Sequence, residues 1–321
     1  MDTKKLVLRH LENNKGSFVS GDRLSKNLGL SRTAVWKAIN GLRKEGHKIK
    51  AHSGKGYILD DASDLLTAEG ILPYLERPVP VLVYDCLEST NKTASGLAMD
   101  GCEEWTTVIA GEQTMGKGRL GRKFYSPPHT GLYLSMVIQP RFDVTKAVLI
   151  TTAASVAVAK AIEEVCGVTP IIKWVNDLYL NGKKVCGILT EALTDFESGR
   201  ISHVILGIGI NCFTTDFPGE AGDHPGSIMG DFSKNRLAGA VIQNVRAILS
   251  DPENRRFMDY YRDHSMVIGK DILVHKAGRD APLPGKATAI DRDGGLKVLY
   301  EDGTTETLRT GEITIRLKDV L

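Results

Sequence analysis

Three short helical repeats occupy the first sixty residues, and their spacing limits what this end of the chain can fold into. Ser20 and Ser31 stand where the second and third helices would begin, and Gly46 stands where the third would end. The tight turn at 28–31, between two short helices, predicts a helix-turn-helix. Apolar residues recur on one face of each repeat: Leu8 and Leu11, then Leu24 and Leu28, then Val35, Ile39 and Leu42.

The same segment is strongly basic and ends in a predicted hairpin. Residues 1–60 contain 13 Lys/Arg and 5 Asp/Glu, whereas the remaining residues contain 28 and 34. A positive excess at one end of a nearly neutral chain favours nucleic acid as the partner of that end. The glycine-centred segment 52–59, with Lys55 near its tip, is typical of the wing of a winged helix.

DNA contacts are expected on the outward side of the third helix and at the hairpin tip. A small three-helix interaction module with a solvated basic face is the alternative interpretation. Because phosphate neutralisation dominates DNA affinity, binding should weaken steeply with salt. The residues expected to contact DNA are Ser31, Arg32, Thr33, Trp36, Lys37 and Lys55, and Arg43 is also expected to face outward.

The remainder of the chain divides in two. A length of 321 residues suggests two or three domains. We expect boundaries at 1–62, 65–266 and 267–321, with an acidic linker at 60–64. In the central part, strand-like and helical runs alternate, and Asn181-Gly182 signals a hairpin, which predicts an α+β fold with an antiparallel or mixed sheet. The last part has short strands separated by turns, typical of a small β-barrel.

Several classes of protein do not fit this sequence. No apolar run reaches the roughly 18–20 residues of a membrane span. The first residues lack the apolar core of a signal peptide, so we expect a cytoplasmic protein with no membrane partner. Five scattered cysteines with no C-x-x-C pair indicate neither a disulfide framework nor a zinc site, and we expect small buried side chains without a protein-bound metal.

A glycine-rich basic loop at 116–122 is the first candidate for chemistry. It contains GxGxxG, but Pro127 and Pro128 follow closely, so it cannot open the helix of a dinucleotide-binding unit. Such a loop suits a ligand that carries a carboxylate and phosphates. A mobile, solvated basic loop is the alternative. Its cations are Lys117, Arg119 and Arg122, and Lys123 follows directly, which makes four cations in the seven residues 117–123.

A second candidate lies around the Asn-Gly hairpin. Strand alternation sends Lys183 and Lys184 to opposite faces, so one of them can point into a site while the other is solvated. A lysine in an otherwise apolar strand is costly unless it meets an anion. The strand that ends at Asn211 carries a polar tip where a ligand group can be bound.

Six motifs in order show that the sequence resembles the bifunctional biotin protein ligases that double as biotin-operon repressors. The likeness spans the chain and implies a winged helix-turn-helix, a central mixed-sheet catalytic domain of the biotin/lipoate-ligase type and an SH3-like C-terminal β-barrel. The motifs are Glu88-Ser89-Thr90-Asn91, Gln113 with 116–127, Leu132-Tyr133-Leu134-Ser135, Lys173-Trp174-Val175-Asn176-Asp177, Lys184-Val185-Cys186-Gly187-Ile188 and Gly207-Ile208-Gly209-Ile210-Asn211.

The resemblance implies a two-step activity and assigns roles to residues. Biotin, ATP and Mg²⁺ give biotinyl-5′-AMP and pyrophosphate, and the biotinyl group then passes to a lysine of biotin carboxyl carrier protein. It implies catalytic roles for Lys184, Arg119 and Lys173. The implied biotin-binding residues are Ser89, Thr90, Asn91, Gln113, Lys117, Gly118, Arg119, Ser135, Lys184 and Gly187. The implied adenylate-binding residues are Arg119, Arg122, Phe124, Lys173, Asn176 and Asn211.

The family pattern also implies regulation, and this sequence departs from it in places. Biotin is expected to act as corepressor, with operator DNA and a homodimer promoted by the bound adenylate. Lys117, Leu120 and Val175 replace residues that are usual in the family. These replacements are expected to affect the rigidity of the loop and the retention of the intermediate more than the reaction itself. The alternatives are a biotin sensor without ligase activity, a lipoate ligase relative, and a ligase whose winged helix no longer binds an operator.

Overall fold

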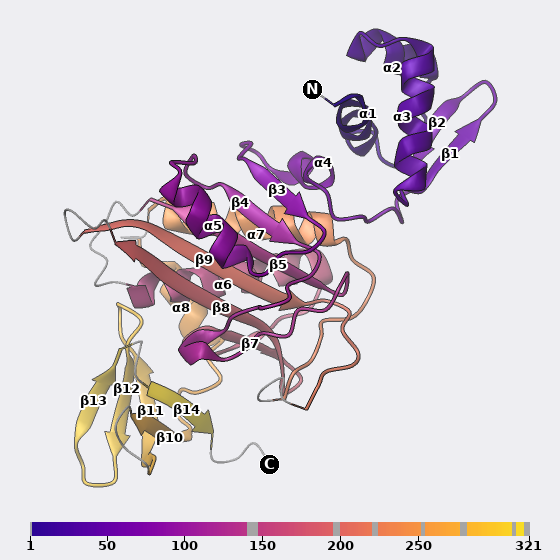
Figure 1. Cartoon of the computed structure of the whole chain (residues 1–321). Helices are drawn as coiled ribbons and strands as arrows, with labels where there is room; N and C mark the ends of the chain where they lie inside the picture. Colours follow the sequence, from indigo (N-terminus) through magenta and orange to yellow (C-terminus); the bar gives the residue numbers. More distant parts are fainter. Residues whose placement is uncertain are drawn as a thin grey trace.

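We describe a computed structural model of the chain, which covers residues 2–139, 147–194, 200–219, 224–251, 254–276, 281–309 and 313–317. Figure 1 shows three parts that follow one another along the chain: a helical module, a central sheet covered by helices, and a small C-terminal sheet. Among the described residues, no helix is both long enough and apolar enough to cross a membrane.

The N-terminal module has the predicted helix-turn-helix. Ser20 and Ser31 accept hydrogen bonds from the amides of Arg23 and Ala34, as N-caps do, and Gly29 adopts a left-handed φ of 64° in the turn. Helix α3 ends at Lys44, two residues before the expected Gly46, with Glu45 as its C-cap. The elements are α1 (Thr3–Glu12), α2 (Gly21–Leu28), α3 (Arg32–Lys44), β1 (Ile49–His52) and β2 (Gly56–Leu59).

A separate apolar core holds this module together. The three helices bury the predicted apolar faces against one another, with Leu24 and Ile39 fully buried. Strands β1 and β2 form an antiparallel hairpin that packs on the same core through Ile49 and Leu59. The sequence interpretation of three helices followed by a hairpin is therefore confirmed.

The central part is a seven-stranded mixed sheet of order β3-β4-β5-β9-β8-β7-β6. Strands β3 and β4 pair in parallel, and all other neighbours pair antiparallel, as the predicted mixed sheet requires. Asn181 and Gly182 both have positive φ in the turn between β7 and β8. The strands are β3 (Val81–Tyr84), β4 (Thr107–Ala110), β5 (Gly131–Ile138), β6 (Ile171–Lys173), β7 (Asp177–Leu180), β8 (Lys183–Thr194) and β9 (Ile201–Asn211).

Helices cover the two faces of this sheet unequally. The large apolar core lies on one face, beneath α6 (Ala147–Cys166), α7 (Lys234–Leu249) and α8 (Phe257–Asp263). Helix α5 (Thr90–Met99) packs on the other face through a much smaller cluster. Because α5 is short, it leaves part of its face uncovered, and the candidate site lies there. Two further short helices, α4 (Ala68–Ile71) and the 3₁₀ helix η1 (Leu72–Tyr74), precede the sheet.

The C-terminal part is a five-stranded antiparallel sheet of order β13-β12-β11-β10-β14. Its β11–β12 turn touches the central part, since the indole of Trp174 donates to the carbonyl of Gly294 at 2.8 Å and Arg262 Nε donates to that of Ile290 at 3.0 Å. The strands are β10 (Asp271–Lys276), β11 (Leu283–Ile290), β12 (Leu296–Tyr300), β13 (Thr305–Leu308) and β14 (Ile313–Leu317).

The five cysteines are all free. Cys186 and Cys212 are buried apolar side chains, as expected, but Cys86 is exposed on the surface. Cys102 and Cys166 are only partly buried, so the expectation of five buried thiols holds for two of them and is wrong for Cys86, which follows the end of an outer strand of the sheet.

The acidic segment at 60–64 is more than a linker. The carboxylate of Asp64 accepts hydrogen bonds from the hydroxyl of Ser233 at 2.5 Å and from the amide of Lys234 at 2.6 Å, at the start of α7. On the other side, Ser63 accepts from the amide of Lys48 at 3.1 Å. Adjacent residues thus join the N-terminal module to the first turn of a core helix.

Replacing Asp64 with Ala should destabilise the central part. Backbone amides at the start of α7 would lose their acceptor, and losing such a cap costs about 1–2 kcal/mol. Urea unfolding should report this drop in the free energy of unfolding. Asp231→Ala is the matched control, because Asp231 is exposed two residues before Ser233. Equal stability of the two variants would contradict the capping role.

Candidate active site and nucleic-acid face

A cavity of about 600 Å³ opens over the face of the sheet that α5 leaves uncovered. Its floor is made of glycines. Gly187 on β8 pairs with Gly209 on β9, and Gly207, two residues before Gly209, lies on the same face of β9. A Cβ on Gly209 would lie 2.5 Å from the ring of Phe124. The missing side chains create the depth of the cavity.

One end of the cavity is polar and almost uncharged. Gln113 Oε1 accepts from both the amide and the hydroxyl of Thr90, at 2.8 and 3.0 Å, while Gln113 Nε2 donates to Ser126 Oγ at 2.9 Å. Ser135 Oγ lies 2.7 Å from Thr90 Oγ1 and 2.6 Å from Asn91 Oδ1. These buried, mutually bonded groups form a rigid surface that can bind a small neutral polar group.

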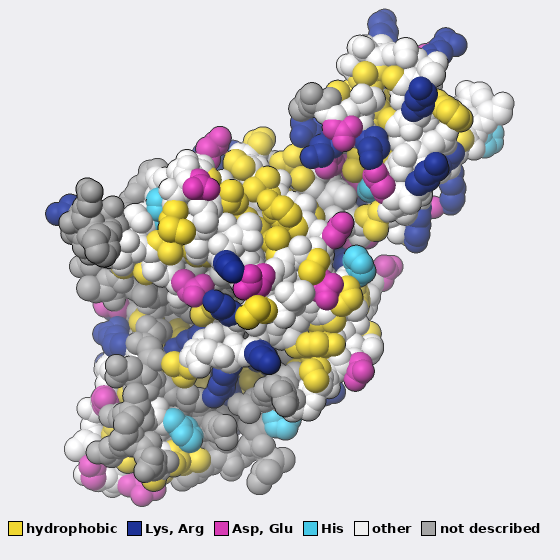
Figure 2. Space-filling view, viewed as in Figure 1, with side chains coloured by type: hydrophobic (Ala, Val, Ile, Leu, Met, Phe, Trp, Pro, Cys, Tyr) yellow, Lys and Arg dark blue, Asp and Glu magenta, His cyan; other side chains and the backbone are white. Residues whose placement is uncertain are grey.

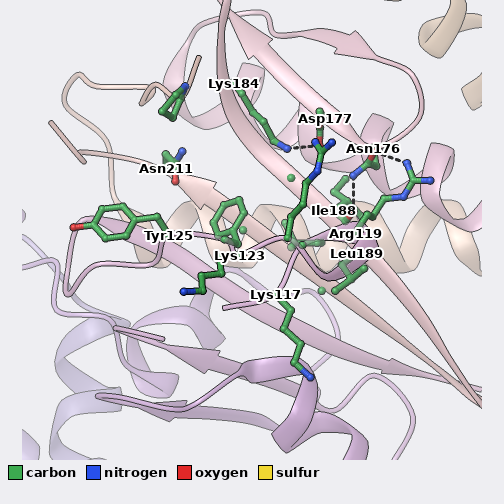
Figure 3. A pocket seen from close by; sticks show the side chains of 18 of the residues that line it. Lys117, Arg119, Lys123, Tyr125, Asn176, Asp177, Lys184, Ile188, Leu189 and Asn211 are labelled. Carbon is green, nitrogen blue, oxygen red and sulfur yellow. Dashed lines mark hydrogen bonds and ion pairs between the residues drawn. The ribbon is translucent and has the colours of Figure 1, made fainter. Parts of the chain in front are cut away.

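The other end is cationic around Asp177 and Asn176, which Figure 3 shows beside Lys184 and Arg119. Lys184 Nζ lies 2.7 Å from Asp177 Oδ1, and Arg119 Nη1 donates to Asn176 Oδ1 at 3.0 Å. Asn176 in turn donates to the carbonyl of Ile188 at 2.9 Å. Among the described residues that line the cavity as a whole, Asp177 is the only carboxylate, against six cations: Lys117, Arg119, Arg122, Lys123, Lys173 and Lys184. The excess positive charge suits a ligand with several negative charges.

The glycine-rich loop forms the rim between the two ends. It folds back on itself, because the amide of Gly118 donates to the carbonyl of Arg122 at 2.7 Å, and it contains the 3₁₀ turn η2 (Arg119–Gly121). Leu120, at the apex of the loop, is exposed. No helix of a dinucleotide-binding unit follows, as the prolines predicted.

Two features of the cationic end mark it as a place for a ligand. Burial lowers the pKa of the Arg119 guanidinium, and the nearby Asp177 opposes that shift. Asn211 lines the cavity, and its buried Oδ1 has no hydrogen-bond partner among the described residues. A buried acceptor without a donor is costly, and a ligand N–H would remove that cost.

The cavity brings together nearly all of the residues that the sequence assigned to ligands. Ser135 is the exception: it is fully buried behind Thr90 and Asn91 instead of lining the wall. Lys183 is exposed and Lys184 faces the cavity, as strand alternation predicted. The residues that line the cavity as expected are Ser89, Thr90, Asn91, Gln113, Lys117, Gly118, Arg119, Arg122, Phe124, Lys173, Asn176, Lys184, Gly187 and Asn211.

Sequence reasoning gave no role to some of the lining residues. Asp177 stands within a motif that was quoted, but its pairing with Lys184 depends on the register of β7 and β8. Phe217 and Pro225 come from an irregular segment after β9, where no periodicity gave a signal. Tyr179 lies directly across the hairpin from Lys184, and that pairing can be read from the Asn-Gly turn.

The helix-turn-helix presents a basic surface in Figure 2, where dark-blue side chains surround the N-terminal module. Thr33, Trp36 and Lys37 are exposed on α3, with Trp36 57% exposed. Lys55 at the hairpin tip lies over the ring of Phe18. This surface combines cations with an aromatic side chain, as DNA-contacting faces do.

Three residues of this surface have internal partners. The hydroxyl of Ser31 caps α3, and Arg32 Nε lies 2.6 Å from Asp22 Oδ1 on the surface. Arg43 does not face outward as expected: its Nε donates to the carbonyl of Ile49 at 2.8 Å and so ties α3 to the hairpin. A surface ion pair such as that of Arg32 is weak enough to be exchanged for a phosphate.

Comparison with known proteins agrees with this geometry. Residues 83–211 match the Biotin/lipoate A/B protein ligase family, and residues 3–58 match an HTH domain. The bifunctional ligase/repressor BirA of Bacillus subtilis (strain 168) is 35% identical over 302 residues, which cover 89% of this chain and 90% of that protein. This chain belongs to the bifunctional biotin protein ligase family.

Other members of this biotin protein ligase family support the assignment. BirA of Escherichia coli (strain K12) is 29% identical, with 94% of each chain covered. The solved biotin protein ligase of Aquifex aeolicus in complex with biotin and ATP superposes with a TM-score of 0.64 at 25% identity, covering 74% of this chain and 99% of that one. The similarity to the BirA proteins therefore extends over both the helix-turn-helix and the ligase part.

Proposed function

We propose that the cavity joins biotin to AMP and that the biotinyl group then passes to a lysine of a biotin carboxyl carrier protein. The observation that carries this proposal is the arrangement of the cavity, with a neutral polar end, a cationic end around Lys184 and Arg119, and one glycine floor beneath both. A biotin protein ligase must hold a neutral ureido ring at one end and bring a carboxylate to a triphosphate at the other. Lys184 and Arg119 at the cationic end favour catalysis over biotin sensing alone.

The polar end is proposed to bind the ureido ring. Thr90, Asn91 and Gln113 form its wall, with Ser135 behind them and Ser89 beside them. A cyclic urea has two N–H donors and one acceptor oxygen, and it gains affinity from such fixed partners. A dithiolane ring has no hydrogen-bond donor, so this polar wall favours biotin over lipoate.

The cationic end is proposed to carry out adenylation. A biotin carboxylate oxygen attacks the α-phosphorus of ATP, and pyrophosphate leaves. Lys184 reduces the repulsion between the two anions and stabilises the charge that develops, with Arg119 and Lys173 assisting. Phe124, Asn176 and Asn211 are proposed to face the adenylate, with Arg122 near its phosphate.

The loop at 116–122 is proposed to close over the product. Lys117 and Gly118 would lie over the ligand, and closure would keep water from the reactive mixed anhydride. The amine of the acceptor lysine then attacks the acyl carbon, and AMP leaves.

Magnesium is proposed to arrive with ATP. Asp177 is the one carboxylate among the described residues that line the cavity, and it is paired with Lys184. Such a donor set fits a magnesium ion held mainly by triphosphate oxygens, the usual arrangement for this ion. When bound, the ion would neutralise phosphate charge.

The organisation of the whole chain is proposed to follow the family. We propose domain boundaries at 1–62, 65–266 and 267–321, with the C-terminal five-stranded sheet forming an SH3-like barrel. We also propose that biotin acts as corepressor, that the adenylate-bound protein is a homodimer and that the basic helix-turn-helix binds operator DNA. A two-fold DNA site matches a dimer of such modules.

Replacing Lys37 with Ala should weaken DNA binding at every sequence tested and lower its dependence on salt. A phosphate-contacting lysine contributes about one unit to the slope of log affinity against log salt. Mobility-shift titrations of the biotin- and ATP-treated protein between low and moderate salt measure both quantities. Lys297→Ala, which removes a C-terminal lysine, serves as control. An unchanged slope for Lys37→Ala would contradict this contact.

The proposed function is tested by transfer to a carrier. Purified protein is incubated with biotin, ATP, Mg²⁺ and an unmodified biotin carboxyl carrier domain, and the intact mass of the carrier is measured. An increase by one biotinyl group on a single lysine is expected. A carrier that stays unmodified while the protein binds biotin would favour a sensor without ligase activity.

A further inference from the structure

Behind the polar wall of the cavity lies a carboxylate that the proposed reaction does not use. Glu191 Oε2 accepts a hydrogen bond from Nδ2 of Asn91 at 2.5 Å. Asn91 lines the cavity and is only 5% exposed. Glu191 lies on β8, two residues beyond Leu189 on the cavity face of the strand. A charged group on the sheet is thus directed at a buried amide of the wall.

Asn91 is held at both ends of its amide. A carboxylate can only accept, so Glu191 requires the Nδ2 end of Asn91 to face it. The Oδ1 end is therefore turned to Ser135, whose hydroxyl donates to it at 2.6 Å. The amide also fills the space above Gly207, where a Cβ would collide with Asn91 Oδ1.

The direction of this bond determines which groups the wall can accept. Ser135 has one hydroxyl hydrogen, and it is committed to Asn91. The hydroxyl hydrogen of Thr90 then has two possible acceptors within the wall. It is donated either to Ser135 Oγ, 2.7 Å away, or to Gln113 Oε1, 3.0 Å away. In both cases Thr90 has no hydrogen left for the cavity and presents only lone pairs there.

We propose that Glu191 is a positioning residue that sets the direction of this hydrogen-bond chain and thereby makes the wall select ligand edges that carry N–H donors. The inference rests on the proposed function, because it assigns the urea edge of biotin to this wall. Without Glu191 the amide of Asn91 can turn over. Ser135 would then be free to donate to Thr90, and Thr90 could donate into the cavity. The wall would accept N–H groups and acceptor oxygens with similar affinity.

The test compares ligands that differ in one group. Biotin has two urea N–H groups, and the two isomeric cyclic carbamate analogues each replace one N–H with oxygen. Desthiobiotin keeps the urea and lacks the thioether. Calorimetry gives the dissociation constant of each for the full-length protein. The wild type should bind one carbamate roughly 100-fold more weakly than biotin. In that isomer the ring oxygen that replaces the N–H would face the lone pairs of Thr90, so two acceptors would meet.

Three variants separate a positioning role from a structural one. In Glu191→Ala, the dissociation constant of that carbamate should exceed that of biotin by only about tenfold or less. The ratio of the dissociation constants of desthiobiotin and biotin should stay unchanged. Glu191→Gln keeps the shape of the side chain, but it should also lower the carbamate-to-biotin ratio, because a glutamine amide can donate as well as accept and no longer fixes the direction of the bond with Asn91. Glu164→Ala, which removes an exposed carboxylate from α6, should match the wild type. Glu191→Leu, which fits a strand, replaces Glu191→Ala if the latter does not fold.

The outcomes are distinguishable. If Glu191→Ala weakens all four ligands by the same factor, or leaves all ratios unchanged, the positioning role is wrong while biotin binding stands. If the folded wild-type protein binds neither biotin nor desthiobiotin, the proposed function fails, and the role of Glu191 fails with it.

Discussion

Replacing Lys184 with Ala should reduce adenylation by at least about tenfold and as much as roughly 1000-fold, the loss seen when one preorganised charge-stabilising group is removed. Lys184 Nζ is paired with the carboxylate of Asp177, which also lines the cavity, at 2.7 Å. Its removal leaves the biotin carboxylate and the α-phosphate without their shared counter-charge. Biotin-dependent release of pyrophosphate measures the rate.

Lys183→Ala is the matched control for Lys184→Ala. The two lysines are adjacent on β8, but Lys183 is exposed on the opposite side of the strand. Its replacement should leave pyrophosphate release near the wild-type rate. Unchanged release by Lys184→Ala would refute the assignment of Lys184, and an equal loss in both variants would indicate a general effect of charge.

Replacing Gly209 with Val should weaken biotin binding by about 100-fold or more, equivalent to about 2.8 kcal/mol. A Cβ at this position would lie 2.5 Å from the Phe124 ring, so the ring must move into the cavity that the glycine floor leaves open. Valine itself suits a β-strand, so β9 should still form. Calorimetric titration with biotin measures the change.

Gly96→Ala is the control for the change at Gly209. Nothing lies within 4 Å of a Cβ built on Gly96, which is on helix α5. The added methyl group should leave biotin affinity unchanged. Wild-type affinity in Gly209→Val would mean that biotin does not bind over this floor.

Short local motifs made much of the site predictable. Gly207, Gly209 and Asn211 alternate along one strand, so their shared face follows from the sequence alone. Lys183 and Lys184 could be separated by the same rule. The glycine-rich loop could be distinguished from a dinucleotide-binding turn because prolines follow it. These predictions depend on a few neighbouring residues, and neighbouring residues are what a sequence gives directly.

Contacts between distant residues were not predictable. Asp64 meets the start of α7 across 170 positions, and Glu191 meets Asn91 across 100. Ser135 shares the sheet face of the site, yet Thr90 and Asn91 lie between it and the cavity. Arg43 sits at an outward helical spacing, but a free carbonyl of the hairpin draws it back. In each case the partner is set by tertiary packing.

The sequence indicates helices α7 and α8 to different degrees. Leu237, Val241 and Val245 recur every four residues in α7, a spacing that indicates a helix from the sequence alone. Helix α8 has only seven residues, too short for periodicity to separate it from a loop. Its stability comes from burial of Tyr261 and its neighbours in the large core.

The most direct test of the account is to detect the intermediate. Purified protein is incubated with biotin, ATP and Mg²⁺, and mass spectrometry is used to look for biotinyl-5′-AMP, with controls that lack biotin or contain lipoate instead. A biotinyl-adenylate, released pyrophosphate and no product with lipoate are expected. Folded protein that forms no adenylate with biotin, or forms one only with lipoate, would contradict the proposed adenylation.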